Sequence, residues 1–382
     1  MAEPNAISAV SFLKNQFPMN SILRNVYFDY FPHLLKFKFE AGTSRGVLKQ
    51  KTTYILKASV FSNPATVGFG EAAPLPLLSL DDIPDFGMKM AGFCKSLSGA
   101  DIPMDAAGFS NWINTNISEH FPSIRFAFET ALLDLFHGGK QQVFDTDFFK
   151  VGKTIPINGL IWMGDKGFMK DQIEKKLDEG YDCIKIKIGA IDFEQECELL
   201  YDIRSRFSKD KITLRVDANG AFSPDQALAK LQILSKFDLH SIEQPIRQGQ
   251  MGQMAELCKV SPLAIALDEE LIGVYGESER RGLLESIMPH YIVLKPTLVG
   301  GIQATREWID LANELGIGWW MTSALESNIG LNAIAQITST FENILPQGLG
   351  TGQLYENNFD SPLVIEKGKI RYDKNLGWGI SQ

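Results

Sequence analysis

Histidine and cysteine are scarce in this sequence, and their scarcity narrows the chemistry that the protein can perform. Its 382 residues include five histidines and four cysteines. The cysteines are far apart and form no C-x-x-C pair, so neither a disulfide framework nor a zinc site is expected. They are Cys94, Cys183, Cys197 and Cys258. Acid–base or metal chemistry therefore has to rely on carboxylates and lysines.

Long apolar runs and clusters of positive charge are also absent. No stretch approaches the roughly 18 apolar residues of a membrane span, and residues 1–15 lack the basic start and apolar run of a secretory signal. Lysines and arginines do not cluster and the formal net charge is −9, which disfavours nucleic acid and membrane surfaces as partners. We therefore expect a cytoplasmic protein that acts on a small-molecule carboxylate. The sequence predicts no oligomeric state.

The chain does contain enough apolar material for a large folded core. Hydrophobic residues make up 45% of the sequence and charged residues 22%, which excludes a disordered protein. Because single cores stop growing at roughly 250–300 residues, the length predicts either two domains or one large barrel.

The first third of the chain is typical of an α+β domain. Residues 22–80 alternate between apolar and polar side chains, as in LLKFKFEAG and TTYILKASVF, which predicts strands. Residues 81–140 show helical spacing and end in SIRFAFETALLDLFHGGK, where two glycines stop the helix. We predict an α+β domain over residues 1–140. The segment LVIEKGKIRYD predicts a strand pair that returns to this domain, so that residues 360–382 complete it.

From about residue 155, short apolar strands alternate with helices, which predicts parallel strands joined by crossover helices. Seven or eight such units favour a (β/α) barrel over residues 150–358, and the pattern alone also allows an open doubly wound sheet. The predicted strands are IPINGLIW, CIKIKIG, ITLRVDANG, HSIEQP, LAIALDEE, YIVLKPT and IGWWMTSALES. The predicted helices include KDQIEKKLDEG, FEQECELLYDIRSRF, SPDQALAKLQILSKF and GIQATREWIDLANELG.

A charged or polar residue ends nearly every predicted strand of this region. The intervals between these residues are 25 to 30 positions, the length of one β/α unit. In a barrel all of them lie at the carboxyl-terminal mouth, where barrel active sites form. They are Lys187, Asp217, Glu243, Asp268, Lys295 and Ser323.

The alternation of side chains within each strand supports this convergence. In residues 183–188 the isoleucines point one way, and Lys185 and Lys187 point the other way. If the apolar side faces the helices, the ionisable groups meet inside the mouth. The same reasoning applies to four further residues, each next to an apolar neighbour: Asp217, Glu243, Asp268 and Lys295.

Three carboxylates from three successive strands form an oxygen-rich site that suits an octahedral Mg²⁺ ion with room for water or substrate. The lysines flank the carboxylates in chain order. A lysine beside a divalent cation loses its proton more readily, so it can act as a base. Charge that develops on a substrate carboxylate is stabilised by such a cation. These residues therefore predict removal of a proton α to a carboxylate, through an enediolate.

Other interpretations fit parts of this set. Asp217 alone is consistent with a helix cap, Asp217 and Asn219 with a turn, and buried charge pairs with a structural network. Lys185 would then only neutralise the carboxylates. Schiff-base aldolases also use a barrel lysine but need no three carboxylates, and a non-enzymatic metal-binding protein needs no lysines. The glycine-rich segment 348–352 matches a phosphate loop weakly, because no Lys-Ser/Thr pair follows it.

In order and spacing, the strand-end residues resemble the enolase superfamily, in its muconate-lactonizing-like branch, whose members pair a lysine or histidine base with Mg²⁺. The motifs are K-x-K, D-x-N, E-x-P, D-E and K-P, which begin at Lys185, Asp217, Glu243, Asp268 and Lys295. The resemblance covers nearly the whole chain and includes GEAAPLP at 70–76, typical of the capping domain, and RFAFETALLDL at 125–135. It implies a (β/α)₇β TIM-like barrel with an N-terminal α+β capping domain.

Within this branch the sequence is most similar to the o-succinylbenzoate synthase family, in TSRGVL (43–48), SALES (323–327) and GLGTG (348–352). Dipeptide epimerases carry at the last strand a D-x-D that holds an α-ammonium group, whereas this sequence has Gly350-Thr351-Gly352 there. An uncharged wall suits a substrate without an amine. The alternative is a dipeptide epimerase or N-acylamino acid racemase, because the same lysine pair serves both chemistries.

The resemblance implies a lyase of menaquinone biosynthesis that dehydrates 2-succinyl-6-hydroxy-2,4-cyclohexadiene-1-carboxylate to 2-succinylbenzoate. Asp217, Glu243 and Asp268 would ligate Mg²⁺, for which Mn²⁺ can substitute. Lys187 would take the α-proton and then help the hydroxyl group to leave as water. Lys295 would stay cationic and stabilise the enediolate from the opposite face.

The resemblance also implies substrate-binding residues around this centre. Residues 323–328 would place a helix N-terminus where it can hold the succinyl carboxylate. Arg45 belongs to a capping-domain loop that closes the site in this family. The full predicted set is Lys185, Asn219, Arg45, Ser323, Glu326, Gly350 and Gly352.

Overall fold

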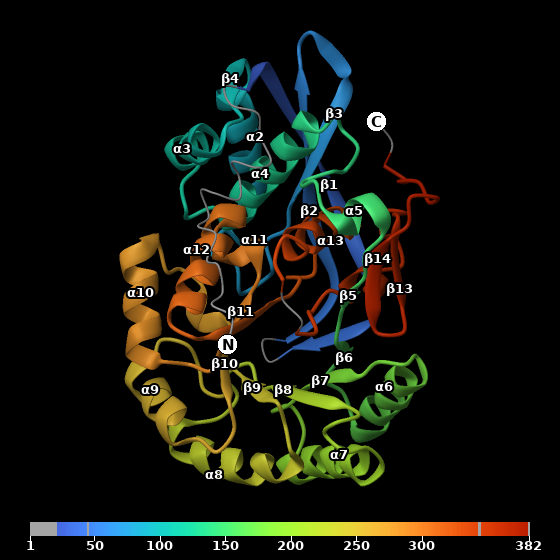
Figure 1. The fold of residues 1–382 in the computed structure, drawn as a ribbon, viewed down its shortest axis with the longest axis vertical. Coiled ribbons are helices and arrows are strands. Elements are labelled where there is room, and N and C mark those ends of the chain that lie inside the picture. The colour runs from blue at the N-terminus through green and yellow to red at the C-terminus, as the bar shows by residue number, and fades with distance from the viewer. Residues whose placement is uncertain (1–20, 44–45, 343–344, 381–382) are drawn as a thin grey trace.

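Two sheets organise the chain in the computed structural model, which describes residues 21–43, 46–342 and 345–380 (Figure 1). One is an antiparallel sheet of four strands in the order β3-β2-β1-β4, and the other is a parallel sheet of seven strands in the order β12 to β6. Among the described residues, no helix combines the length and apolar character needed to cross a membrane.

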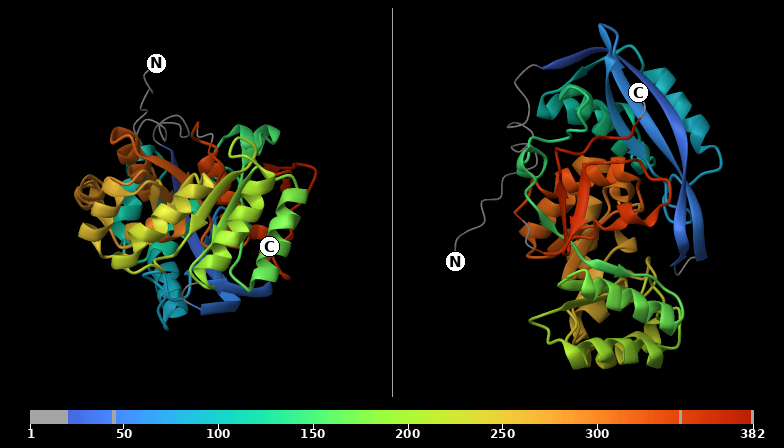
Figure 2. Two further views of the ribbon diagram at one scale, coloured as in Figure 1. Left: turned by 90° about the horizontal axis from the view of Figure 1, so that it is seen from below. Right: turned by 90° about the vertical axis from the view of Figure 1, so that its right-hand side faces the viewer.

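The N-terminal part, which we call the cap, has the α+β organisation that the sequence predicts. Its long hairpin β1–β2 runs down along the molecule toward the parallel sheet, as the right view of Figure 2 shows. Strand β4 lies within the region predicted to be helical and pairs with β1. The elements of the cap are β1 (Ile22–Thr43), β2 (Gly46–Val60), β3 (Asn63–Ala72), α2 (Phe86–Leu97), β4 (Ala100–Pro103), α3 (Ala106–Asn116) and α4 (Pro122–Phe136).

Helix α4 lies directly against β3 because two glycines of that strand have no side chain. A Cβ atom at Gly70 would lie 2.0 Å from the carbonyl oxygen of Ala127, and one at Gly68 would lie 2.2 Å from that of Ala131. Because side chains alternate along a strand, Glu71 projects from the opposite face of β3. There its carboxylate contacts a helix of the parallel sheet.

The parallel sheet has the strand–helix alternation that the sequence predicts. Its strands are neighbours in strict chain order, so this part of the chain shows no reversal of the kind that defines a doubly wound sheet. Helices α6 to α10 form an arc outside the strands (Figure 1). The elements are α5 (Asp147–Val151), β5 (Ile155–Pro156), β6 (Gly159–Ile161), α6 (Lys166–Asp178), β7 (Cys183–Lys187), α7 (Phe193–Arg206), β8 (Thr213–Asp217), α8 (Pro224–Leu234), β9 (Ser241–Glu243), α9 (Met251–Val260), β10 (Ile265–Leu267), α10 (Gly276–Ile287), β11 (Tyr291–Leu294), α11 (Pro296–Val299), α12 (Gly301–Glu314), β12 (Gly318–Met321) and α13 (Asn328–Thr338).

A short extended segment links the two edges of this sheet. Gln347 forms a parallel bridge with Ile157, just before β6, and Gly348 forms one with Thr322, just after β12. The sheet is curled, and the carboxyl ends of its strands face a common space.

The C-terminal strand pair is present, and its pairing differs from the expected one. Strands β13 (Leu363–Glu366) and β14 (Lys369–Tyr372) form an antiparallel hairpin, and β14 pairs with β5 instead of a strand of the cap. The chain after the hairpin does reach the cap, because Trp378 and Ile380 pack on Ile55 and Phe69. The strand pair itself is therefore held by backbone hydrogen bonds to β5, and the residues after it contact the cap.

Two glutamates of the cap occupy the N-termini of two helices of the parallel sheet. Glu129 on α4 accepts hydrogen bonds from the backbone N–H groups of Ile302 and Gln303, at the start of α12. Glu71 on β3 accepts from the N–H groups of Ser327 and Gly330, at the start of α13, each at 2.8 Å. Negative charge is favourable at these ends because the helix dipole is positive there and the first N–H groups lack intrahelical partners. The two contacts attach the cap to the parallel sheet.

The buried Glu129 carboxylate predicts a pH dependence of stability. Burial raises the pKa of Glu129 to about 7, whereas an unfolded glutamate titrates near ~4.3. Between these values the folded protein binds more protons than the unfolded chain, so the free energy of unfolding falls as the pH rises.

In Glu129→Gln, which keeps an acceptor oxygen for α12 but cannot ionise, we expect that fall to be smaller by at most ~1.4 kcal/mol per pH unit. Urea unfolding between about pH 5 and pH 7 measures the slope. The exposed Glu256→Gln on α9 is the matched control and should leave the slope unchanged. A slope in Glu129→Gln equal to that of the unmodified protein would contradict the titration.

Candidate active site

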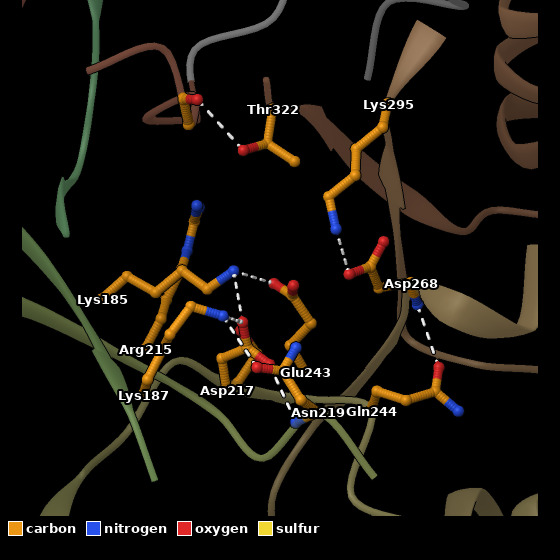
Figure 3. Close-up of polar contacts among 12 residues, drawn as sticks. Lys185, Lys187, Arg215, Asp217, Asn219, Glu243, Gln244, Asp268, Lys295 and Thr322 are labelled. Atoms are coloured by element: carbon orange, nitrogen blue, oxygen red, sulfur yellow. Dashed lines mark hydrogen bonds and ion pairs between the residues drawn. The ribbon is translucent and has the colours of Figure 1, made fainter. Parts of the chain in front are cut away.

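Lysines and carboxylates from five neighbouring strands meet at one end of the parallel sheet, as the spacing in the sequence predicts. Figure 3 shows their side chains pointing toward a common space. They come together because each occupies an inward position at the carboxyl end of its strand. Lys185 and Lys187 belong to β7, Asp217 and Glu243 end β8 and β9, and Asp268 and Lys295 directly follow β10 and β11.

The ammonium group of Lys185 lies between two carboxylates. Its Nζ atom is 2.6 Å from Glu243 Oε2 and 3.0 Å from Asp217 Oδ2. Burial opposes the charge on Lys185, but the carboxylates of Asp217 and Glu243 outweigh it and raise the pKa of Lys185. Lys185 is therefore held as a cation that neutralises its two neighbours.

Lys187 stands at the edge of this group and faces the open space. Its Nζ atom donates to Asn219 Oδ1 at 2.8 Å and to Asp217 Oδ2 at 3.1 Å. It lies 6.0 Å from the centre of the Trp162 ring. Asn219 is itself fixed, because its Nδ2 atom donates to Glu269 Oε1 at 3.1 Å. These contacts orient the amine without enclosing it.

Lys295 approaches from the opposite side and forms an ion pair with Asp268 (Figure 3). Burial opposes the charge on Lys295, but the carboxylates of Asp268, Glu269 and Glu243 outweigh it and raise its pKa. Lys295 is therefore protonated, and it lies across the carboxylates from the lysines of β7.

The surrounding charges shift the pKa values of Asp217 and Glu243 in opposite directions. Burial favours the neutral form of both. For Asp217, the ammonium groups of Lys185 and Lys187 outweigh burial and lower the pKa. For Glu243, burial and the charge of Asp217 raise the pKa to about 8. The two carboxylates therefore differ in acidity because two lysines contact Asp217 and one contacts Glu243, and further positive charge in this space would lower the pKa of Glu243.

The donor set fits a hard divalent cation. As they stand, no three carboxylate, imidazole or thiol groups of the described residues are gathered closely enough to hold a metal ion. The lysines supply the positive charge instead. However, three carboxylates project from neighbouring strand ends, which is the oxygen ligation that such ions prefer. Glu243 Oε1 is buried and has no hydrogen-bond partner among the described residues, which suits an atom that would ligate such an ion.

A cavity of about 410 Å³ lies over these polar groups. Phe39 of the cap packs edge-on against Trp162, with ring centres 5.9 Å apart. A ligand with a polar end and a flat apolar body therefore fits the space, with its polar end on the lysines. The large apolar residues of the walls include Phe39, Leu48 and Leu75 from the cap, and Leu160, Trp162 and Phe168 from β6 and its surroundings.

The structure separates the other predicted site residues into two groups. Ser323 and Gly350 line the cavity. Glu326 is fully buried behind the wall, where it accepts hydrogen bonds from the hydroxyl groups of Ser323 and Thr297. Gly352 packs against Asn328 and Leu331, where a Cβ atom would lie 2.4 Å from Asn328 Oδ1. Arg45 lies outside the described residues.

The helix N-terminus predicted to hold a substrate carboxylate is already occupied. The N–H groups of Ser327 and Gly330 donate to Glu71, and that of Ile329 donates to the Ser327 hydroxyl. Asn328 N–H donates to Asn358 Oδ1. The cap supplies a carboxylate to this helix end, a contact that no local pattern in the sequence reveals, and the substrate contact predicted there stays a prediction.

Several site residues escaped prediction. Trp162 lies two positions beyond the inward-facing Leu160, so the alternation used for the other strands would have found it. Phe39 comes from the cap, far away in sequence, and no motif marks it. Gln244 directly follows Glu243 in the E-x-P motif, where its role depends on folded contacts.

Gln244 joins the loops that carry two of the carboxylates. Its backbone has φ 41°, in the left-handed region, and its side chain is fully buried. Its Oε1 atom accepts hydrogen bonds from the N–H groups of Asp268 (Figure 3) and Glu270. Its Nε2 atom donates to Glu270 Oε2 at 3.0 Å. Gln244 thereby fixes the backbone of Asp268 relative to Glu243.

The sequence matches a family of known proteins over more than half its length. Residues 169–382 match the family described as "Enolase C-terminal domain-like". The chain is 50% identical over 357 residues to an o-succinylbenzoate synthase from Desulfotalea psychrophila, and the match covers 88% of this chain and 96% of that protein.

The fold also matches solved structures. The crystal structure of MenC from Desulfotalea psychrophila superposes with a TM-score of 0.81 and 44% identity, covering 91% of this chain and 99% of that one. The substrate-liganded L-Ala-D/L-Glu epimerase from Bacillus subtilis superposes with a TM-score of 0.77 and 18% identity, covering 91% and 96%. The second likeness concerns the fold alone.

The contacts of Gln244 predict a variant with weakened cation binding. In Gln244→Leu the Asp268 backbone loses its acceptor, so we expect the Kd for a divalent cation to rise by about 10- to 100-fold. Isothermal titration calorimetry measures this change. The control is Gln253→Leu on the exposed face of α9. Unchanged affinity in a folded Gln244→Leu protein would show that Gln244 does not position the ligands.

Proposed function

Because the chain belongs to the enolase superfamily, we propose that it has o-succinylbenzoate synthase activity. It is a lyase that removes water from 2-succinyl-6-hydroxy-2,4-cyclohexadiene-1-carboxylate and forms 2-succinylbenzoate, a step of menaquinone biosynthesis, in the cytoplasm. The observation that carries this proposal is the pair of lysines on opposite sides of three strand-end carboxylates, in a chain with a close relative of that activity.

Asp217, Glu243 and Asp268 hold Mg²⁺ in this proposal, since their oxygens suit a hard ion and Glu243 Oε1 is buried without a partner among the described residues. When bound there, Mg²⁺ stabilises negative charge that develops on the substrate carboxylate. Mn²⁺ substitutes for it.

Lys187 is the base and then the acid. Its amine faces the cavity, oriented by Asn219 and Asp217. In its neutral form it takes the proton from the ring carbon that bears the carboxylate, and the electron pair of that C–H bond moves into the carboxylate to give the enediolate, from which it returns to form the new ring double bond as the hydroxyl group leaves. The resulting ammonium returns the proton to the hydroxyl group on the neighbouring carbon as the C–O bond breaks. Water leaves from the same face, and the ring becomes aromatic, which makes the elimination strongly downhill.

Lys295 has the complementary role. Its raised pKa keeps it cationic, so it does not compete for the proton. From the opposite side of the carboxylates it stabilises the electron-rich ring after proton removal, partly through the ring face. Lys185 remains a cation between Asp217 and Glu243 and contacts the substrate from the side of these carboxylates.

The walls of the cavity favour this substrate over the amines and amides of related enzymes. Aromatic side chains such as Phe39 and Trp162 match a flat ring. At the end of the last strand, Gly350 and Thr351 line the cavity without a charge, where dipeptide epimerases hold an ammonium group. Dipeptide epimerization or N-acylamino acid racemization is the alternative, with Lys295 as the second base.

We also infer the finer architecture. The seven strands and the bridging segment at Gln347 form a closed (β/α)₇β barrel, supported by the bridges at both sheet edges. Residues 1–140 with 360–382 form the capping domain, supported by the packing of Trp378 and Ile380 on cap strands. Residues 150–358 form the catalytic barrel.

The direct test is ultraviolet spectroscopy of purified protein with the cyclohexadiene precursor, with and without Mg²⁺. We expect conversion to the aromatic product at an enzyme-like rate that depends on the metal. Absence of conversion by a folded, metal-binding protein would refute the synthase proposal. Proton exchange on dipeptides and N-acylamino acids would then test the alternative.

The assignment of the base predicts the behaviour of Lys187→Ala. We expect turnover to fall by at least about 10³-fold, because the variant has no group to move the proton, while Mg²⁺ binding and folding stay near normal. Lys211→Ala, which truncates an exposed lysine before β8, is the control. Residual turnover within about tenfold of the unmodified protein would assign the base elsewhere.

A further inference from the structure

The turn that follows β12 forms part of the cavity wall and is strained. Ser323, Ala324 and Leu325 line the cavity. Leu325 has φ 66°, in the left-handed region that a side chain with a Cβ rarely adopts. Such a conformation persists only where the surrounding contacts impose it, and it is often found at ligand-binding walls.

Three hydrogen bonds impose this conformation. The carbonyl oxygen of Leu325 accepts from Lys51 Nζ at 3.0 Å and from the Tyr355 hydroxyl at 2.7 Å. The Leu325 N–H group donates to Ser323 Oγ at 3.0 Å. Tyr355 is in turn held by the cap, because its ring packs on Phe37 of β1 with centres 4.8 Å apart.

Lys51 is an unusual residue for this place. It comes from β2 of the cap and is 2% exposed, although an ammonium group is costly to bury. Besides Leu325, it donates to the carbonyl oxygens of Ala324 and Ala73, at 3.3 and 3.1 Å. The three hydrogen bonds of Lys51 thus connect the end of β3, at Ala73, to the turn at Ala324 and Leu325.

The same short segment is fixed on its other sides as well. Glu326 accepts from the Ser323 hydroxyl, and Glu71 of the cap accepts from Ser327. Glu71 therefore ties the Ser327 end of this segment to the cap, and Lys51 supplies the cap contact at the point of strain.

We propose that Lys51 is a positioning residue for the substrate: its buried ammonium group holds the strained Ser323–Leu325 wall in its binding shape. This inference rests on the proposed function for the identity of the ligand. Lys51 itself touches no reacting atom. The metal-binding carboxylates lie on β8 to β10, and Lys51 leaves them unaffected.

The first test is Lys51→Met, which keeps the length of the side chain and removes its donors. We expect KM for the cyclohexadiene precursor to rise by about tenfold or more, with kcat changed less than about threefold, because ground-state and transition-state binding are lost together. The Kd for Mg²⁺ stays unchanged. Lys57→Met, on the same strand with its amine over the Phe31 ring, is the matched control and leaves KM unchanged.

Hydrogen exchange tests, without any substrate, whether Lys51 holds the Ser323–Leu325 wall in place. We expect the amide protons of Leu325 and Glu326 to exchange about tenfold faster or more in Lys51→Met, because the turn that aims them at Ser323 Oγ loses the hydrogen bonds that fix its carbonyl groups. Peptides that cover β8 to β10 should be unchanged. A general loss of stability would instead accelerate exchange everywhere.

Tyr355→Phe covers the case in which Lys51→Met fails to fold. It removes only one hydroxyl donor to Leu325, so we expect a rise in KM of about threefold with normal folding. The exposed Tyr27→Phe is its control. Leu325→Gly adds a second comparison: because glycine adopts positive φ without strain, Lys51→Met should raise KM less in that background.

The outcomes separate the two proposals. If the unmodified protein does not convert the precursor but Lys51→Met accelerates exchange at residues 325–326 alone, the proposed function fails and the positioning role stands. If KM and local exchange are unchanged in folded Lys51→Met, or in folded Tyr355→Phe where the first variant does not fold, the positioning role is refuted. Equal effects of Lys51→Met with and without Leu325→Gly would also refute it.

Discussion

Carboxylates that share a buried space repel one another, and this site holds three of them only because lysines lie among them. Lys185 between Asp217 and Glu243 is the central contact. Its raised pKa keeps it charged, so the amine remains a fixed part of the site, whereas Lys187 stands at the edge with room to act. Lys185 thus differs from Lys187 in that it contacts two carboxylates where Lys187 contacts one.

The cap contributes residues that line the cavity and carboxylates that bind two helix N-termini beside the site. Its hairpin brings Phe39 and Leu48 to the cavity, and its glutamates satisfy the N-termini of α12 and α13. Buried acids at helix N-termini and a buried lysine on carbonyl groups are stable because each meets the opposite partial charge. The cap thus supplies part of the apolar walls, whereas the part of the chain that forms the parallel sheet supplies the polar floor and the rest of the walls.

The polar floor of the site could be predicted from the sequence, and the walls could not. Lys187, Asp217 and Glu243 repeat at the interval of one β/α unit, and strand alternation gives their direction, so local patterns are sufficient. Phe39 and Lys51 reach the site through the packing of the cap, a long-range contact that no periodicity encodes. The contact of Glu71 with the helix end after Ser323 was missed for the same reason, because the two lie more than 250 positions apart.

Fold prediction shows the same limit. The parallel sheet follows from alternating strands and helices, and the cap from strands followed by helices. Strand β4 and the pairing of β14 with β5 depend on which edge is free once the layers have assembled. The contacts of Glu71 and Glu129 with α13 and α12 also imply an order in which the parts of the protein assemble. The ribosome makes the cap first, and these acids meet their helices only after the last third of the chain has emerged. Until α12 and α13 have been made, Glu129 and Glu71 have no helix N-termini to bind, so these contacts of the cap cannot form before those helices exist.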